Sequence, residues 1–329
     1  MTLSVILLMG ALALGSARAV STVAFISNRD GQTQLYLLDV DHGVVHNISR
    51  KIDDDSQLEV TTFSWSPTSE HIAYIGAARL NFDLYVLDAD GAELRLLAQT
   101  RAADVRPSWS PDGAALAYHA TTAGLNNDVF TIALDASTPR NLTRTFAGDN
   151  HRWPQWSPDG QQIAFYSDAD DALDIFVLDT MPGAAPRNLT NGEVFARAPD
   201  WSPDGARVAF NTFGILYTVA PDNRHITELL RTEDGFRRTF WSPDGTQLAL
   251  SWSGNLHIVS ADGSHPPRQL TEQLTVAEEI TWSPDGSRLV FSGFTASGSR
   301  DLYMINADGS GLRRLTTHPA LDMAPAWRP

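Results

Sequence analysis

Hydrophobic residues in this chain recur in short blocks, in which large and small side chains alternate and polar turns follow. Representative blocks are Ile72-Ala73-Tyr74, Ile163-Ala164-Phe165, Val208-Ala209-Phe210 and Leu289-Val290-Phe291. A second apolar run comes after many of these blocks, as at 84–87 and 302–305. Because alternate residues of a strand face opposite sides, the pattern predicts short β-strands that are buried on both faces.

A repeated motif punctuates these strands. The sequence Trp-Ser-Pro-Asp-Gly begins at Trp109, Trp156, Trp201, Trp241 and Trp282, with a degenerate copy at Trp65 and a truncated one at Trp327. Successive tryptophans are 44, 47, 45, 40, 41 and 45 residues apart. A four-stranded propeller blade takes about 40–45 residues. Each unit therefore predicts strand A ending in the motif, a turn, strand B, a loop, strand C, a turn and strand D.

The ends of the chain predict how the ring closes. Val23-Ala24-Phe25 matches strand B of a unit that lacks its own strand A, and Pro325-Ala326-Trp327 supplies a strand A at the other end. We therefore expect an all-β fold over residues 20–329. It is a β-propeller of seven four-stranded blades, closed by the C-terminal strand joining the N-terminal blade. Closure removes the unpaired edges that would invite aggregation.

The motif resembles the repeat of TolB-type propellers, which occurs in the bacterial periplasmic protein TolB and in related exported proteins. The resemblance covers nearly all of the mature chain and is specific for the fold, not for function. TolB has six blades and an α/β domain before them, and this chain departs from both. The resemblance therefore implies a propeller and export, rather than TolB's own role in the Tol–Pal envelope system.

Composition and the N-terminal segment bear on location. The formal net charge of −15 disfavours nucleic acid and anionic membrane surfaces as partners. No cysteine is present, which excludes disulfides, thiol chemistry and a lipoprotein anchor. Residues 3–14 are apolar and Ala17-Arg18-Ala19 follows, which predicts a signal peptide over 1–19. We expect a periplasmic or extracellular monomer with no membrane insertion after cleavage; an uncleaved anchor or a buried first strand is the alternative.

Motifs for catalysis and for cofactors are missing from the sequence. It contains no G-x-S-x-G elbow, no HExxH, no Walker loop and no GxGxxG. We therefore predict no catalytic residue, no metal ligand and no cofactor. We interpret Asp90 as a residue of a blade turn. We interpret Asp168, Asp170 and Asp171 as residues of a solvated loop rather than of a calcium site.

Other recurring polar residues have structural interpretations. Four aspartates precede strand C and predict repeated structural hydrogen bonds: Asp83, Asp128, Asp174 and Asp301. Three Asn-x-Ser/Thr sequons fall at one point of strand D and read as part of the repeat: Asn47, Asn141 and Asn188.

A basic and aromatic set breaks the repeat. Arginines stand three or four residues before the motif tryptophan, and two tryptophans lie outside the motif: Arg106, Arg152, Arg197, Arg237 and Arg238, with Trp153 in a D–A loop and Trp252 near a B–C loop. Strand A lines the channel, so we expect these side chains to converge at its mouth and bind an anionic group. The alternative is local pairing with Asp104, Asp149 or Asp234.

The sequence therefore favours an exported binding module over an enzyme. The expected ligand is a protein or peptide partner that carries an anionic group, held on the channel-mouth face. Two alternatives stay open. One is a carbohydrate-active lyase or hydrolase with converging histidines in the central channel, since related seven-bladed pectin-fragment lyases bind a metal through histidines. The other is a purely structural envelope component.

Overall fold

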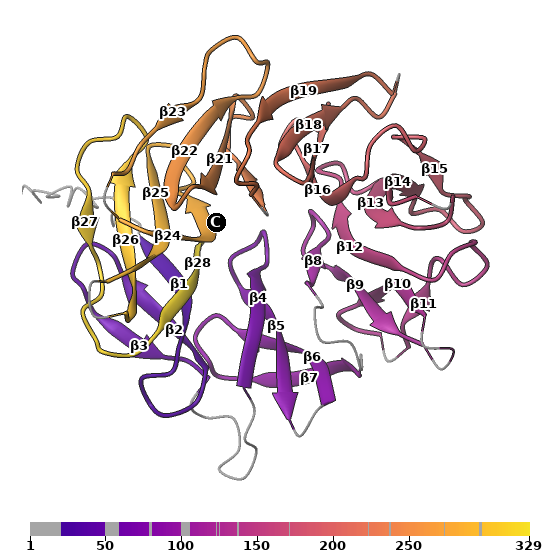
Figure 1. Cartoon of the computed structure of the whole chain (residues 1–329). Coiled ribbons are helices and arrows are strands. Elements are labelled where there is room, and N and C mark those ends of the chain that lie inside the picture. Colours follow the sequence, from indigo (N-terminus) through magenta and orange to yellow (C-terminus); the bar gives the residue numbers. More distant parts are fainter. Residues whose placement is uncertain are drawn as a thin grey trace, which may run out of the picture.

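A computed structural model describes residues 21–329 apart from 50–58, 79–80, 100–105, 123, 125, 137, 171, 223, 237, 273 and 296–297. The predicted signal segment, Asp104, Asp171 and Arg237 thus lie outside the described residues. The described part of the chain forms 28 β-strands and no helix. It therefore has no helix long and apolar enough to cross a membrane. Figure 1 shows the strands grouped as sheets around a central axis.

The strands form seven four-stranded antiparallel sheets, the blades, each of which runs from strand A through B and C to strand D. Blade 1 holds β28 (Asp322–Trp327), β1 (Thr22–Ser27), β2 (Gln34–Asp39) and β3 (Val45–Asn47). Blade 2 holds β4 (Glu59–Trp65), β5 (His71–Ala78), β6 (Asn81–Asp88) and β7 (Leu94–Gln99), and blade 3 holds β8 (Ser108–Trp109), β9 (Ala115–Thr121), β10 (Asn127–Ala133) and β11 (Arg140–Asn141). Blade 4 holds β12 (His151–Trp156), β13 (Gln162–Ser167), β14 (Asp174–Asp179) and β15 (Arg187–Asn188). Blade 5 holds β16 (Arg197–Trp201), β17 (Val208–Thr212), β18 (Ile215–Val219) and β19 (Ile226–Arg231), and blade 6 holds β20 (Thr239–Trp241), β21 (Gln247–Trp252), β22 (Asn255–Ser260) and β23 (Arg268–Gln269). Blade 7 holds β24 (Val276–Trp282), β25 (Arg288–Phe294), β26 (Arg300–Asn306) and β27 (Arg313–Arg314).

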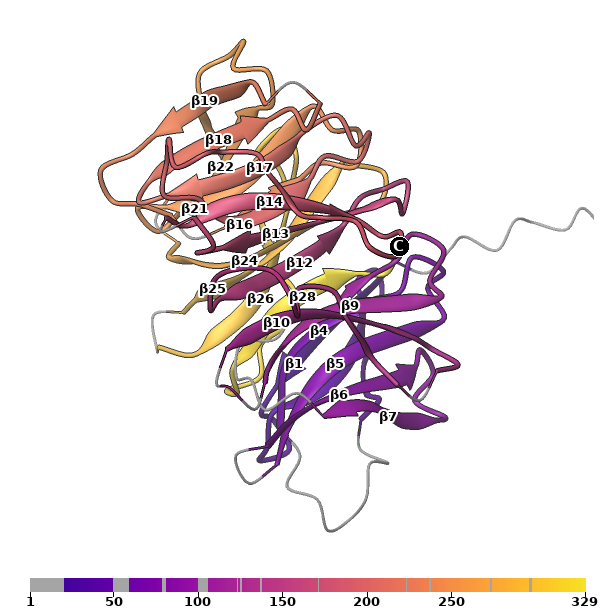
Figure 2. The ribbon, with the colours of Figure 1, turned by 90° about the vertical axis from the view of Figure 1, so that its right-hand side faces the viewer.

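The ring closes as the sequence predicts. Strand β28 pairs antiparallel with β1, placing Trp327 opposite Val23 and Asp322 opposite Ser27. Figures 1 and 2 show β28 (yellow) beside the indigo N-terminal strands. Buried Asp322 accepts a hydrogen bond from Ser27 Oγ at 2.6 Å and two from Arg29 Nη2 at 2.9 Å each. Blade 1 is therefore held together by a buried ion pair as well as by its ladder.

The core lies between the blades. The predicted large–small alternation of strand B is confirmed, because Ile72 and Tyr74 pack in the cluster shared with blade 1, whereas Ala73 packs in the cluster shared with blade 3. Blade 5 repeats this division: Val208 and Phe210 face blade 4, and the alanine between them faces blade 6. Large side chains on one blade thus meet small ones on the next, which permits close packing.

Motif tryptophans also tie neighbouring blades together through hydrogen bonds. The indole Nε1 donates to the backbone carbonyl of the residue just before the motif tryptophan of the preceding blade, at 3.0–3.2 Å. Five such bonds are present among the described residues, from Trp65, Trp109, Trp201, Trp241 and Trp282.

Two junctions use a different bond. In them, the backbone N–H of Trp156 donates to Ser108 Oγ at 3.2 Å, and that of Trp327 donates to Thr281 Oγ1 at 3.3 Å. The buried Nε1 atoms of Trp156 and Trp327 have no hydrogen-bond partner in the part of the chain that the structure describes. The links between blades are therefore of two kinds, and the difference falls at the junctions of blades 3 with 4 and 7 with 1.

Trp201→Phe and Trp156→Phe form a matched pair that tests the indole link. Both substitutions remove similar volume, but only the first removes a satisfied hydrogen bond and leaves the Gln155 carbonyl without its donor. We expect Trp201→Phe to lower the free energy of unfolding by about 1 kcal/mol more than Trp156→Phe. Urea unfolding of both variants measures the difference, and equal losses would contradict the assignment.

Asp322→Ala tests the closure of the ring. Removal of this carboxylate leaves Arg29 partly buried without its partner, and side-chain exposures of 14% for Arg29 and 0% for Asp322 place the pair away from water. We expect a loss of about 3–5 kcal/mol in the free energy of unfolding. Asp90→Ala, in an exposed blade turn, is the control and should unfold almost as the wild type does.

Candidate functional site

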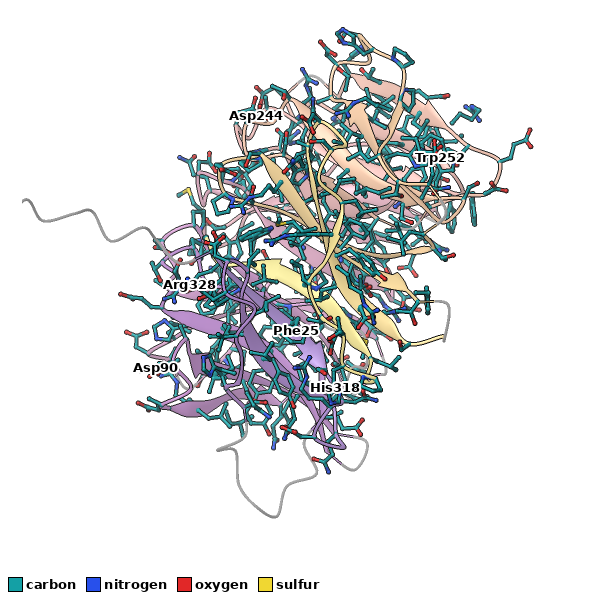
Figure 3. The ribbon with its side chains drawn as sticks, turned by 90° about the vertical axis from the view of Figure 1, so that its left-hand side faces the viewer. Phe25, Asp90, Asp244, Trp252, His318 and Arg328 are labelled. Atoms are coloured by element: carbon teal, nitrogen blue, oxygen red, sulfur yellow. The ribbon has the colours of Figure 1, made fainter. Side chains whose placement is uncertain are left out.

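The two faces of the ring carry different connections. Figure 3 shows Asp90, Asp244 and Arg328 toward one face and Trp252 and His318 toward the other. The first face carries the A–B and C–D turns, and we call it the turn face. The second carries the D–A and B–C connections, and we call it the mouth face. First strands contact one another in order around the ring, so the residues that precede each motif tryptophan surround the channel on this face.

Trp153 has a left-handed backbone conformation on the mouth face, which Ala198 and Ala324 share at the equivalent positions of blades 5 and 1. It lies within strand β12 and not in a loop, which corrects the sequence-based expectation. The register of β12 against β13 shifts between Arg152 and Gln155, and Trp153 has a φ of +56°. Bulky residues rarely adopt this left-handed conformation, which costs about 1–3 kcal/mol. A β-bulge re-aims a side chain, and here it directs the indole out of the regular alternation of the strand.

Two of the predicted arginines meet on this indole. The guanidinium carbon of Arg106, from blade 3, lies over the Trp153 ring at 5.4 Å from the ring centroid. That of Arg238, from blade 6, lies over the same ring at 5.8 Å. Arg238 also lies 4.9 Å from the centroid of Phe240. Blades 3, 4 and 6 thus bring two cations and one indole together, and we call Arg106, Trp153 and Arg238 the mouth group.

Arg152 turns away from the mouth group. Its Nη2 donates to Asn150 Oδ1 at 3.2 Å, and with the Asn127 amide oxygen turned toward it, Nη2 and Nε reach that oxygen at 2.8 and 3.2 Å. Its charge lies close to the buried His119 of blade 3. Arg152 therefore links blades 3 and 4, and the expected convergence of all the arginines is wrong at this residue.

Arg197 lies apart from the mouth group as well. Its guanidinium carbon is 4.8 Å from the ring centroid of Phe195 and 5.6 Å from that of Phe213. Both phenylalanines are on the mouth face of blade 5, one in the D–A connection and one in the B–C turn. Arg106 and Arg238 stand three residues before their motif tryptophan, whereas Arg152 and Arg197 stand four before theirs. Neighbouring strand positions point in different directions, which accounts for the division.

Trp252 is the last residue of β21 and flanks the two-residue B–C turn of blade 6, as the sequence predicts. Its ring stacks on His257 with centroids 3.6 Å apart and planes 9° from parallel. It also packs against the core between blades 5 and 6, so its contacts are those of local packing rather than of the mouth group. Asp149 and Asp234, the acids proposed as local partners, accept hydrogen bonds from Asn126 Nδ2 and Ser253 Oγ respectively.

Asp200 of β16 adds a carboxyl near the mouth group that sequence reasoning missed. Burial raises the pKa of Asp200 to about 7, although the positive charge of Arg238 lowers it. The residue keeps some solvent exposure, but protein surrounds it in the channel wall, which explains the strong desolvation. At neutral pH this carboxyl is only partly ionised.

Acidic and amide residues elsewhere have structural partners. Asp128, Asp174 and Asp301 each bond or pair with a residue in or just after strand D, namely Thr143, Thr190 and Arg314, which confirms their predicted role. The Asn141 and Asn188 side chains bond to Asp128 and Asp174.

Asp168 differs from its prediction as a solvated loop residue. Its carboxylate accepts backbone N–H bonds from Asp149 and Asn150, at 2.9 Å each, and a side-chain bond from Asn150 at 2.7 Å. Asp168 therefore joins the B–C loop of blade 4 to the D–A connection that precedes the blade. Within the described ranges, no three His, Cys, Asp or Glu residues come together as a metal site could require.

Comparison with known proteins defines the class. The chain matches the family model of the TolB beta propeller domain over residues 50–214 and 183–329. It therefore belongs to the TolB β-propeller domain family. A curated relative, the Tol-Pal system protein TolB of Anaeromyxobacter dehalogenans, is 48% identical over 46 residues, which is 14% of this chain and 10% of that protein. The match thus spans a small part of the relative's length.

Solved structures share the fold. TolB from Acinetobacter baumannii superposes with a TM-score of 0.61 and 19% identity, covering 94% of this chain and 67% of that one. Oligogalacturonate lyase from Vibrio parahaemolyticus superposes with a TM-score of 0.67 and 13% identity, covering 86% of each chain. At such identities these likenesses establish the propeller and leave the activity to the site itself.

His119→Gln tests the electrostatics of the junction between blades 3 and 4. Burial, and then the charge of Arg152, lower the pKa of His119 to about 3. In the unfolded chain His119 binds a proton near pH 6.5, whereas in the folded protein it stays neutral until about pH 3. Because the unfolded state binds more protons in this range, His119 makes the folded state less stable as pH falls from 6.5 toward 3. We expect the free energy of unfolding of the variant to depend less steeply on pH in this window, as urea unfolding between pH 7 and 5 can measure.

Asp200→Asn is the matched control, because the sign of its effect is opposite. The folded state holds a proton on Asp200 below about pH 7, whereas the unfolded carboxyl binds one only near its ordinary, lower pKa. Asp200 therefore adds stability as pH falls from 7, and the variant should lose that gain. Parallel pH profiles for both variants would contradict the two assignments.

Proposed function

We propose that this chain is an exported binding module that holds an anionic group of a protein or peptide partner at the mouth of its channel. The observation that carries the proposal is the mouth group, in which Arg106 and Arg238 lie over the two-ring system of Trp153 from different blades. Exposed or half-buried tryptophan with arginine is the composition typical of binding hot spots.

Electrostatics support an anion as the recognised group. Two guanidinium groups share one indole in a chain whose formal net charge is −15. Asp200, the nearby carboxyl, is only partly ionised at neutral pH. A carboxylate or phosphate from a partner fits two neighbouring guanidinium groups, because the planar guanidinium is suited to bind either in a bidentate manner.

Export is part of the proposal. It is supported by the apolar run at residues 3–14 followed by Ala17-Arg18-Ala19, and by membership of the TolB propeller family. The partner would accordingly be met in the periplasm or outside the cell. A monomeric state stays a prediction.

The enzyme alternative has no specific observation in its favour. A carbohydrate-active lyase or hydrolase would use acid, base or metal-binding side chains that converge in the channel. The oligogalacturonate lyase shares the propeller at 13% identity, which supports the fold alone. Metal analysis of the purified mature chain remains a direct check, because stoichiometric metal would favour the enzyme.

A photo-crosslinker at Ala198 tests the binding proposal in the native host. Ala198 has a φ of +51° and stands three residues before its motif tryptophan, so its backbone has the conformation that carries an aromatic side chain at Trp153. We expect a covalent adduct with a partner protein, and an adduct yield at least about tenfold lower when Arg238→Gln or Arg106→Gln is added.

The control places the same crosslinker at Met181, an exposed residue in the C–D connection on the turn face. The proposal fails if both positions give the same adducts, or if the arginine variants leave the adduct from position 198 unchanged. Thermal unfolding of each variant distinguishes a lost contact from a lost fold.

A further inference from the structure

A pair of exposed phenylalanines stands on the mouth face of blade 5. Phe213 is 78% exposed and Phe195 is 38% exposed. Their rings stack with centroids 5.3 Å apart and planes 22° from parallel. Arg197, also exposed, lies over both rings. We call Phe195, Phe213 and Arg197 the rim cluster. Single exposed apolar residues are ordinary on a protein surface. Two stacked aromatic rings form a contiguous apolar patch, and such patches often mark interaction sites.

The backbone of Phe213 has a conformation that is unfavourable for a phenylalanine. Phe213 is the first residue of a two-residue turn between β17 and β18, with Gly214 second, and the two have φ values of +31° and +99°. Such turns favour asparagine, aspartate or glycine at the first position, because both residues need positive φ. A phenylalanine there destabilises the turn and exposes an aromatic ring, so folding alone gives no reason for it.

Hydrogen bonds nevertheless hold the backbone of this turn. Thr232 donates its N–H and its Oγ1 to the carbonyl of Gly214, at 2.8 and 3.1 Å. A side chain at Gly214 would meet the Thr232 carbonyl oxygen at 2.5 Å, so only glycine fits. Phe195 is fixed in a similar way, because the buried Ala196 that follows it donates its N–H to Leu173 at 2.7 Å. Hydrogen bonds thus hold the backbone beside both rings, which lowers the backbone entropy lost on binding.

Charge identifies the kind of partner. Arg197 has no ion pair and no side-chain hydrogen bond with any residue that the structure describes. Its guanidinium carbon lies over the two rings, and its N–H groups have no acceptor among the described residues. Those groups match a carboxylate. A second copy of this chain would bring another charge of −15, so self-association through this patch is disfavoured.

We propose that the rim cluster is a docking site for a segment of a partner polypeptide that places an apolar side chain beside an aspartate or glutamate. The apolar side chain packs on the exposed face of Phe213, and the carboxylate accepts hydrogen bonds from the edge of Arg197. The site is separate from the mouth group, which is built from blades 3, 4 and 6. It shares no residue with the mouth group, so variants of Trp153 and of Phe213 test the two proposals separately.

Selection from a random-peptide display library on the immobilised protein tests the site without assuming a partner. Binding of synthetic copies of the enriched peptides is then measured by fluorescence anisotropy. We expect enriched peptides to carry an aromatic or aliphatic residue next to Asp or Glu. Phe213→Asn and Arg197→Gln should each weaken binding about tenfold or more, and replacing the peptide's acid by its amide should do the same.

Stability separates a binding effect from a folding effect. Phe213→Asn creates Asn-Gly, the preferred pair for this turn, so its melting temperature should equal or exceed that of the wild type while binding is lost. Met181→Ser removes an exposed apolar side chain on the turn face and should change neither property. Trp153→Gly alters the mouth group and should leave these peptides bound.

Several outcomes would overturn the docking site. They are a selection without enrichment, enriched peptides that lack an acid, and peptides that bind Phe213→Asn as well as the wild type. A rim cluster that binds glycans on an array, and no peptide, would assign it to sugars and refute the inference. Peptides that depend on Trp153 instead of Phe213 would belong to the mouth group and would count against the rim cluster alone.

Discussion

A hydrogen bond from an indole to the carbonyl of the preceding blade is the constraint on which much of this ring depends. At five of the seven junctions it fixes strand A relative to the one before it, and so it fixes where the residues ahead of the motif tryptophan lie. At the junction of blades 3 and 4 this bond is replaced by a link from Trp156 N–H to Ser108 Oγ. The buried Trp156 Nε1, His119 Nδ1 and His151 Nε2 lie near this junction without a hydrogen-bond partner among the described residues. Unsatisfied buried polar atoms are therefore concentrated at the junction of blades 3 and 4.

Positive charge is gathered on the mouth face, although the chain as a whole is acidic. The mouth group concentrates two guanidinium groups on one indole, and the rim cluster adds a third on two phenylalanine rings. Each of these cations lies over an aromatic face, whose negative quadrupole stabilises the charge. Aromatic rings thus help to hold arginines on the mouth face of a protein that has many carboxylates.

An aromatic residue with positive φ lies in each of these two surfaces. Among the described residues with positive φ other than glycine, Trp153 and Phe213 are the two aromatic ones. One lies in a β-bulge of strand A and the other in a two-residue turn, so different local devices place a large ring in a left-handed conformation. Strain of this kind persists only where the surrounding structure holds it, and it clusters at binding and switch sites.

The sequence by itself determined the number of blades, the strand order within each blade and the closure by 325–327, because these follow from local periodicity and turn chemistry that repeat along the chain. It also selected the arginines and Trp153, because they break the repeat. Only the tertiary structure decided that Arg106 and Arg238 meet on Trp153 while Arg152 and Arg197 do not. That outcome depends on a one-residue difference in strand position and on a bulge, which composition does not reveal. Asp200 and Phe213 lay beyond sequence reasoning for a related reason: desolvation and exposure belong to the assembled ring and not to any single blade.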